Sequence, residues 1–366
     1  MGLCALEGVR VGHAHDVDTL HGCTVVMFDK QLPVAFKAYG GGVATMGTDA
    51  LGSNKAFWRR RGLFMAGGSM TGLRTGTVLA DWLVQEDELV GNETDRTANV
   101  LNPAVAGAVI FDLGMARGPF SRILAQDACG CARVGVAQRG NVGVGVGACV
   151  GKFAAVGPQA RTAPSKSGLG TAVLQLPGGV LVAAMSVVNA YGNVIGPDGQ
   201  ILCGNRDGHG GFVDYPGSPD APLLTTLNDS PVGTNTTISI VGINVDLEIR
   251  ENYEQLAHQG SLGQSRALRP VNTAVDGDCV FVFSTTQHQN WLTTQGNYRL
   301  AGGPSVGVDV IGNAVAEAVQ ASIYDAVYSA ESITFAGVLG DVVPGLASPP
   351  TSPRPATNTH RPETEQ

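Results

Sequence analysis

The bond between Asn235 and Thr236 is the place where this sequence most clearly offers chemistry. Thr236 carries a hydroxyl next to a peptide bond, and its attack on the Asn235 carbonyl would convert the amide into an ester that water can hydrolyse. The new chain would begin with Thr236, and a free α-amine, with a pKa of roughly 7.7–8.0, can take the hydroxyl proton near neutrality. The sequence therefore predicts a self-cleaving precursor with nucleophile and base on one residue.

The sequence on either side favours such a cut. Residues 215–233 are dense in Pro, Gly, Asp, Asn and Ser, which is typical of a long exposed loop. Residues 236–241 are almost all β-branched, so a strand should hold Thr236 rigidly while the loop departs. The alternatives are an ordinary loop-to-strand junction and an N-glycosylation sequon. Two equally good sequon matches elsewhere, and no visible signal peptide, argue against the sequon.

Composition narrows the class of protein. Of 366 residues, 43% are hydrophobic and 15% charged, yet no apolar run reaches the roughly 18 residues of a membrane span. The net charge of -8 argues against a nucleic-acid surface. The seven Cys form no zinc pattern, and their odd number without a secretory leader indicates reduced thiols. We expect a cytoplasmic protein of one large or two ordinary domains, without a membrane or nucleic-acid partner.

Hydrophobic periodicity predicts alternating strands and helices. Strands are expected at 8–13, 23–28, 33–38, 179–188, 236–241 and 279–283, and helices at 77–84, 248–268 and 314–330. In the last helix, Val315, Val319, Ile323 and Val327 form one apolar stripe. From residue 344 the sequence turns to Pro, Ser, Thr and charge, so residues 344–366 are expected to form a disordered tail.

Polar groups at strand ends could assist the nucleophile. Asn189 ends the apolar run 179–188, where its amide could donate to a developing oxyanion; the alternative is a turn-forming residue. Asp276 and Asp278 stand at the entrance of the strand 279–283, where two carboxylates could orient an ammonium group. An ordinary Asp-Gly turn explains the same pattern.

Two lysines follow glycine-rich sequence and could carry the basic partner. Lys152 follows Gly151, and Lys166 lies in the segment 164–170. Either could instead be ordinary surface charge. The run 140–147 superficially matches a dinucleotide fingerprint, but its glycines alternate at strand period, so a close-packed strand or loop fits better.

A glycine turn at 67–73 is the remaining candidate. It follows an apolar strand pattern and precedes a helical one, so its backbone amides could cradle an anion or oxyanion. Close packing of helix on sheet is the alternative. His13, His15 and His21 lie close together in the sequence, but loop histidines are more often solvated or locally hydrogen-bonded than metal ligands.

Taken together, these motifs resemble the family of self-processing aminopeptidases and amidases that includes the D-aminopeptidase DmpA, β-peptidyl aminopeptidases and nylon-oligomer hydrolases. The resemblance covers most of the chain. It is carried by the segments 9–13, 67–69, 107–112, 235–239 and 276–278. The segment 235–239 looks like the processing site of the nylon-oligomer hydrolases.

The resemblance implies an α/β fold, a layered αββα sandwich of the DmpA type. It implies fragments 1–235 and 236–343, cleaved heterodimers assembled into a homo-oligomer, and no metal or organic cofactor. It makes Thr236 the nucleophile, Asn189 an oxyanion ligand, and Lys152 with Asp276 and Asp278 a charged network, with Lys166 ranked below Lys152.

The same resemblance places substrate contacts in the glycine turn, at Gly68, Ser69 and Thr71. Relatives commonly have Tyr where this chain has Thr71, and the shorter side chain would widen the pocket. The Asp276 and Asp278 pair is similar to the nylon-hydrolase branch.

The implied activity is hydrolysis of linear, amine-bearing amides such as ω-amino-acid oligomers. The alternatives are an aminopeptidase acting on β- or D-peptides and a non-catalytic small-ligand-binding protein of the same fold.

Overall fold

The architecture was analysed in a computed structural model of the chain. It describes residues 2–89, 104–113, 115–135, 137–153, 164–207, 209–215, 235–288, 306–334 and 342–346. The loop expected at 215–233 falls outside these residues except for Tyr215.

One hydrogen-bonded path of strands runs through the molecule in the order β3-β5-β4-β2-β14-β12-β9-β8, with β1 paired to β2. These strands are β1 (Val9–Asp16), β2 (His21–Ala38), β3 (Thr45–Met46), β4 (Arg59–Ala66), β5 (Val105–Val109), β8 (Leu169–Leu176), β9 (Val180–Asn189), β12 (Thr236–Val245) and β14 (Cys279–His288). The α-helices are α1 (Arg74–Leu89), α2 (Arg122–Gly130), α3 (Arg250–Ala267) and α5 (Val306–Tyr328).

Shorter elements complete the described chain. They are the strands β6 (Cys149–Val150), β7 (Ser165–Lys166), β10 (Asn193–Ile195), β11 (Ile201–Cys203), β13 (Leu268–Arg269), β15 (Ile333–Thr334) and β16 (Val342–Val343). The 3-10 helices are η1 (Gly2–Ala5), η2 (Asp49–Leu51), η3 (Ser69–Leu73), η5 (Gly143–Gly147) and η6 (Pro177–Gly179).

Strand β2 connects the two halves of this path. Its first part, from Cys23 to Met27, pairs with β4, and its last part, from Val34 to Ala38, pairs with β14. The register shifts between Met27 and Leu32. The prediction of two separate strands at 23–28 and 33–38 is therefore wrong: the polar residues between them look like a turn, but the strand continues through an irregularity.

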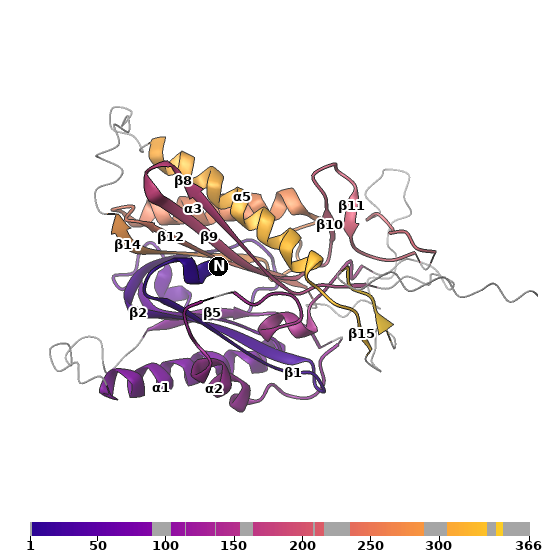
Figure 1. Ribbon diagram of the computed structural model, residues 1–366, viewed down its shortest axis with the longest axis horizontal. Helices are drawn as coiled ribbons and strands as arrows, with labels where there is room; N and C mark the ends of the chain where they lie inside the picture. The colour runs from indigo at the N-terminus through magenta and orange to yellow at the C-terminus, as the bar shows by residue number, and fades with distance from the viewer. Residues whose placement is uncertain are drawn as a thin grey trace, which may run out of the picture.

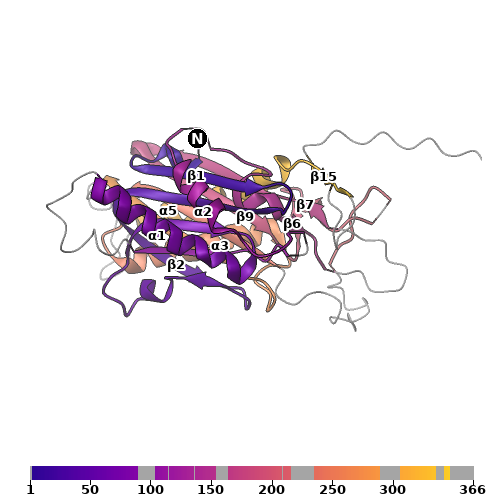
Figure 2. The same cartoon turned by 90° about the horizontal axis from the view of Figure 1, so that it is seen from below.

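The halves stack as two sheets with helices outside. Helices α3 and α5 cover β8, β9, β12 and β14, while α1 and α2 lie on the far side of the half that contains β1 and β5 (Figure 1). Seen from below, α1 and α2 lie in front of the strands (Figure 2). A buried cluster joins the two halves and includes Phe28, Met65, Ile238 and Phe281. These layers confirm the expected αββα arrangement.

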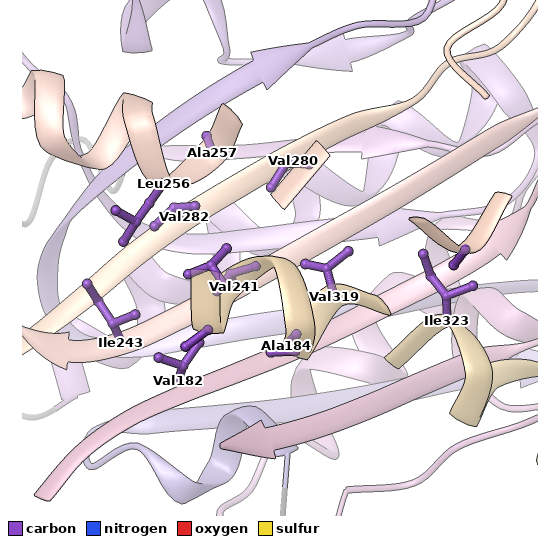
Figure 3. Close-up of a cluster of buried hydrophobic side chains, with 14 of the residues drawn as sticks. Val182, Ala184, Val241, Ile243, Leu256, Ala257, Val280, Val282, Val319 and Ile323 are labelled. Atoms are coloured by element: carbon purple, nitrogen blue, oxygen red, sulfur yellow. The ribbon is translucent and has the colours of Figure 1, made fainter. Parts of the chain in front are cut away.

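The strand that begins at Thr236 lies deep in this arrangement. All ten residues of β12 are buried. Its side chains alternate, as a strand dictates, with Ile238 and Ile240 in the core between the sheets and Val241 and Ile243 in the core beneath the helices. Figure 3 shows the second of these cores. The stripe predicted for α5 is confirmed, since Val315, Val319, Ile323 and Val327 are all buried in it.

The packed chain extends past residue 343. The Lys166 N–H donates to the Pro344 carbonyl at 2.8 Å. The Gly345 N–H donates to Ser332 Oγ at 2.9 Å, and Leu346 packs against the core. The tail boundary expected at 344 is therefore too early, because these three residues are held by the fold; 347–366 lie outside the described residues. Among the described helices, none has the length and hydrophobicity required to cross a membrane.

Candidate active site

Thr236 is the first residue of β12, between two neighbouring strands. It lies opposite Asn189 at the end of β9, and two residues later Ile238 pairs with Cys279 at the start of β14. The side chain is 3% exposed, and its hydroxyl donates to the carbonyl oxygen of Asn235. The candidate nucleophile and the carbonyl group of the predicted cleavage site are thus in contact inside the fold.

A second donor reaches the same carbonyl. The backbone N–H of Gly277 donates to the Asn235 oxygen at 2.8 Å, in a parallel bridge between Asn235 and Asp276. We did not single out Gly277 in the sequence, where it looks like an ordinary turn glycine. Its position depends on a pairing between residues far apart in the chain, which no local pattern reveals.

The carboxylates of Asp276 and Asp278 hold the backbone around Thr236. Asp278 Oδ1 accepts the Thr237 N–H at 2.5 Å, and Oδ2 accepts the Asn272 N–H at 2.9 Å. Burial, and secondarily the charge of Asp276, raise the pKa of Asp278 to about 7. Asp278 therefore anchors Thr237, which follows the candidate nucleophile, and the Asp278 carboxyl group changes charge near neutrality.

Asp276 is tied to the loop in front of β14. Its Oδ2 accepts the N–H of Thr273 at 2.9 Å and the hydroxyl of Thr273 at 2.6 Å, while Oδ1 accepts the Tyr191 N–H at 3.4 Å. Asp276 thus links this loop to the chain that follows Asn189. Both carboxylates accept hydrogen bonds from backbone N–H groups, and the charges of both act on the Lys152 ammonium.

Lys152 belongs to the electrostatic environment of these carboxylates. Its backbone is fixed by a hydrogen bond from its N–H to the Tyr191 carbonyl at 3.0 Å. Burial lowers the pKa of its ammonium to about 7, while neighbouring acidic groups, Cys149 and Asp276 foremost, oppose part of that shift. Much of Lys152 is therefore a neutral amine at neutral pH, the form that can accept a proton.

Lys166 has a different environment. Its fully buried ammonium donates to the carbonyls of Gly145 at 2.9 Å, Ala148 at 3.1 Å and Ser167. Burial lowers its pKa to about 8. These contacts hold the glycine-rich segment together, and the ranking of Lys166 below Lys152 as a catalytic group stays a prediction. That segment forms the 3-10 helix η5, where we expected a strand or loop.

Asn189 bridges three segments near Thr236. Its Oδ1 accepts the Cys149 N–H at 3.2 Å, and its Nδ2 donates to the Phe111 carbonyl at 2.9 Å. The side chain thus ties the end of β9 to β6 and to the chain after β5. Asn189 ends β9, as expected from the sequence, and its role toward an oxyanion stays a prediction.

The glycine turn is built mainly by its own contacts. Gly68 has φ 79°, a conformation that glycine adopts without strain, and its N–H donates to Asp112 Oδ1 at 2.7 Å. Thr71 Oγ1 donates to the Gly68 carbonyl at 2.6 Å and accepts the Phe120 N–H at 3.1 Å. The Ser69 N–H donates to the Ile110 carbonyl at 3.1 Å. The Thr71 hydroxyl therefore stabilises the turn, and substrate contacts at Gly68, Ser69 and Thr71 stay a prediction.

Asp112 is a further residue whose importance we missed. It is 3% exposed, and burial raises the pKa of its carboxyl group, with the charges of His21 and Lys152 acting in the opposite direction. It connects the glycine turn electrostatically to Lys152. The only sequence signal for Asp112 was its place in the segment 107–112, which carries part of the family resemblance.

His13, His15 and His21 each lie within hydrogen-bond distance of another group of the protein. His13 Nδ1 lies 3.0 Å from Thr24 Oγ1, and His21 Nε2 donates to the Gly118 carbonyl at 2.8 Å. His15 Nδ1 accepts the Gly143 N–H at 3.4 Å. In the part of the chain that the structure describes, no group of three or more His, Cys, Asp or Glu side chains is placed to hold a metal ion.

Comparison with known proteins places this geometry in a family. The model of peptidase family S58 matches residues 2–339. The chain belongs to this family. The resemblance drawn from the motifs is thereby confirmed, and the protein is an amide-bond hydrolase of the S58 type.

Sequence relatives carry two kinds of name. An uncharacterized aminopeptidase of Mycobacterium leprae (strain TN) is 30% identical over 93% of this chain and 96% of its own length. A 6-aminohexanoate-oligomer endohydrolase of Paenarthrobacter ureafaciens is 27% identical over 87% of this chain and 84% of its own.

A solved structure supports the fold. The L-aminopeptidase D-Ala-esterase/amidase of Ochrobactrum anthropi, described as a variant of the Ntn hydrolase fold, superposes with a TM-score of 0.65. At 17% identity it covers 94% of this chain and 90% of its own. This likeness confirms the layered architecture.

Proposed function

We propose that this S58 protein cuts itself between Asn235 and Thr236 and then hydrolyses amides with Thr236 as N-terminal nucleophile. The observation that carries the proposal is the contact between the Thr236 hydroxyl and the Asn235 carbonyl. That contact lies at the first residue of a strand buried along its whole length, so the nucleophile is positioned before any bond breaks. The cleaved heterodimers would then assemble into a homo-oligomer.

Different bases serve the two reactions. Before the cut, the Thr236 nitrogen is an amide and cannot accept the hydroxyl proton, so self-cleavage needs another base. Lys152 fits this role, since its pKa is lowered to about 7 and carboxylates surround it. After the cut, the α-amine of Thr236 becomes the base for substrate hydrolysis. Asp278 holds the Thr237 N–H and so keeps the new terminus in register with β14.

The substrate class we propose is linear amides that bear an amine, such as ω-amino-acid oligomers. Support comes from relatives named 6-aminohexanoate-oligomer endohydrolases, which are 27–28% identical over 87% of this chain. Free carboxylate charge supports it less than we expected, because Asp276 and Asp278 are engaged by backbone N–H groups.

Aminopeptidase activity on β- or D-peptides is the second candidate. The observation favouring it is that the mycobacterial relatives, at 30–31% identity, are named aminopeptidases. Comparing kcat/KM for a 6-aminohexanoate oligomer, a β-dipeptide and a D-configured α-dipeptide amide separates the two candidates. Preference for the oligomer supports the first, and preference for either dipeptide supports the second.

Self-cleavage itself is tested with a matched pair of threonine variants. Thr236→Ala should remain one chain and lose activity. Thr77→Ala, on helix α1, removes a hydroxyl that bonds only locally to the Arg74 carbonyl, and it should be cut and active. A folded Thr236→Ala protein that retains hydrolase activity would contradict the proposal. A folded wild-type chain that stays uncut and inactive would favour a non-catalytic binding protein.

A further inference from the structure

We infer that the backbone N–H of Gly277 stabilises the oxyanion that forms when the chain cuts itself. This role rests on the proposed self-cleavage, in which the Gly277 N–H would be the oxyanion donor. The N–H already donates to the Asn235 carbonyl oxygen at 2.8 Å, within the 2.7–3.1 Å range expected of an oxyanion donor. The Thr236 hydroxyl contacts the same oxygen, so donor and nucleophile converge on one carbonyl group.

The chemical step defines what this N–H would do. Thr236 Oγ1 forms a bond to the Asn235 carbonyl carbon, and the π electrons of the carbonyl move onto its oxygen. The hydroxyl proton passes through a neighbouring base to the Thr236 nitrogen. When the oxyanion collapses, the carbon–nitrogen bond breaks and leaves an ester; water then releases the Asn235 carboxylic acid and restores the hydroxyl. Negative charge therefore develops on the one oxygen that Gly277 contacts.

The loop that carries Gly277 is held on both sides. The Asp276 carbonyl accepts the Gly42 N–H at 2.7 Å, and the Asp278 carbonyl accepts the Tyr39 N–H at 3.0 Å. The side chains of Asp276 and Asp278 are bonded to backbone groups as described above. The N–H is thus fixed before the reaction and needs no reorganisation when charge develops, which is the condition for strong oxyanion stabilisation.

The absence of a side chain at this position fits the same role. A Cβ on residue 277 would lie 2.7 Å from Thr236 Oγ1 and 3.1 Å from Thr236 Cγ2. Glycine therefore lets the backbone approach the nucleophile closely enough to reach the carbonyl. The Gly277 hydrogen bond could also serve a purely structural role, because the bridge between Asn235 and Asp276 extends the parallel pairing of β12 with β14 in the same register.

Replacing the Gly277 amide by an ester separates the two roles. Glycolic acid in place of Gly277, introduced by cell-free translation with a suppressor tRNA, removes the N–H and adds no side chain. The matched control is glycolic acid in place of Gly42, whose N–H donates to the Asp276 carbonyl. An ester at 277 also makes the Asp276 carbonyl a weaker acceptor for the Gly42 N–H. The control variant removes that same hydrogen bond by removing its donor, the Gly42 N–H.

The readout is the rate at which full-length chain disappears, followed on gels after synthesis. Losing one oxyanion donor should slow cleavage about 10²–10³-fold, whereas the Gly42 ester should change it by less than about tenfold. The free energy of unfolding of both ester variants, measured in a Thr236→Ala background where no cut occurs, checks that the two are equally stable. Equal rates for the two esters would overturn this inference alone. A wild-type chain that never cuts would overturn the proposed function and this inference together.

Discussion

The two candidate lysines should separate when each is replaced by methionine. Lys166→Met removes the ammonium hydrogen bonds to the carbonyls of Gly145, Ala148 and Ser167, while backbone N–H groups still donate to the first two. A hydrogen bond to a charged group contributes about 1.5–3 kcal/mol, so losing three costs several kcal/mol. Removing the buried charge offsets about 3 kcal/mol of this loss of stability, because burial lowers the pKa of Lys166 from 10.5 to about 8. We expect a net loss of stability of about 3 kcal/mol.

Lys152→Met should show the opposite pattern. Its pKa is lowered further, to about 7, so the fold disfavours its charge and a neutral residue there should cost less stability than at position 166. Loss of the base should nevertheless slow self-cleavage about 10²–10⁴-fold. Lys166→Met should slow cleavage far less, provided that it folds.

Urea unfolding in a Thr236→Ala background measures stability without interference from cleavage, and a gel time course measures the cut in the native background. The reasoning would be refuted if Lys152→Met destabilised the protein as much as Lys166→Met, or if Lys166→Met were stable and blocked the cut.

Further predictions concern pH, coupling and the glycine beside the nucleophile. The rate of self-cleavage should rise with pH through about 7, because Lys152 loses its proton there. Asp278→Asn should lower the midpoint of this rise, since the Asp278 carboxylate raises the pKa of Lys152. Cleavage rates measured in buffers from acid to alkaline pH check this, and an unchanged midpoint in the variant would contradict it. Lys152→Ala combined with Asp278→Ala should cut little more slowly than the poorer single variant, because both serve one network; additive losses in folded protein would reject the network. Gly277→Ala should also block the cut, because its Cβ would crowd Thr236 Oγ1 at 2.7 Å; a rate equal to wild type would show that the loop yields.

Local sequence patterns were sufficient for the elements that position the site. The β-branched run after Asn235 and the apolar run before Asn189 became neighbouring strands, and the stripe on α5 is buried as expected. These signals are local, since periodicity and β-branching act within one element. The continuity of β2 was missed because the polar residues between its two parts resemble a turn.

The contacts that make the site depend on pairing between distant residues. Gly277 meets Asn235, Gly68 meets Asp112, and Lys166 meets carbonyls of the segment 145–148. A sequence pattern can indicate a carboxylate near a strand, but not which backbone N–H it will accept. For that reason the sequence offered candidate residues for the site, but not the groups that they contact.

The central claim is that the chain cuts itself before Thr236, and the mass of the purified, denatured wild-type protein tests it most directly. The account predicts two polypeptides, residues 1–235 and 236–366, the second containing 366 − 235 = 131 residues and beginning with Thr236 on N-terminal sequencing. A single uncut chain of 366 residues that hydrolyses amides would contradict it.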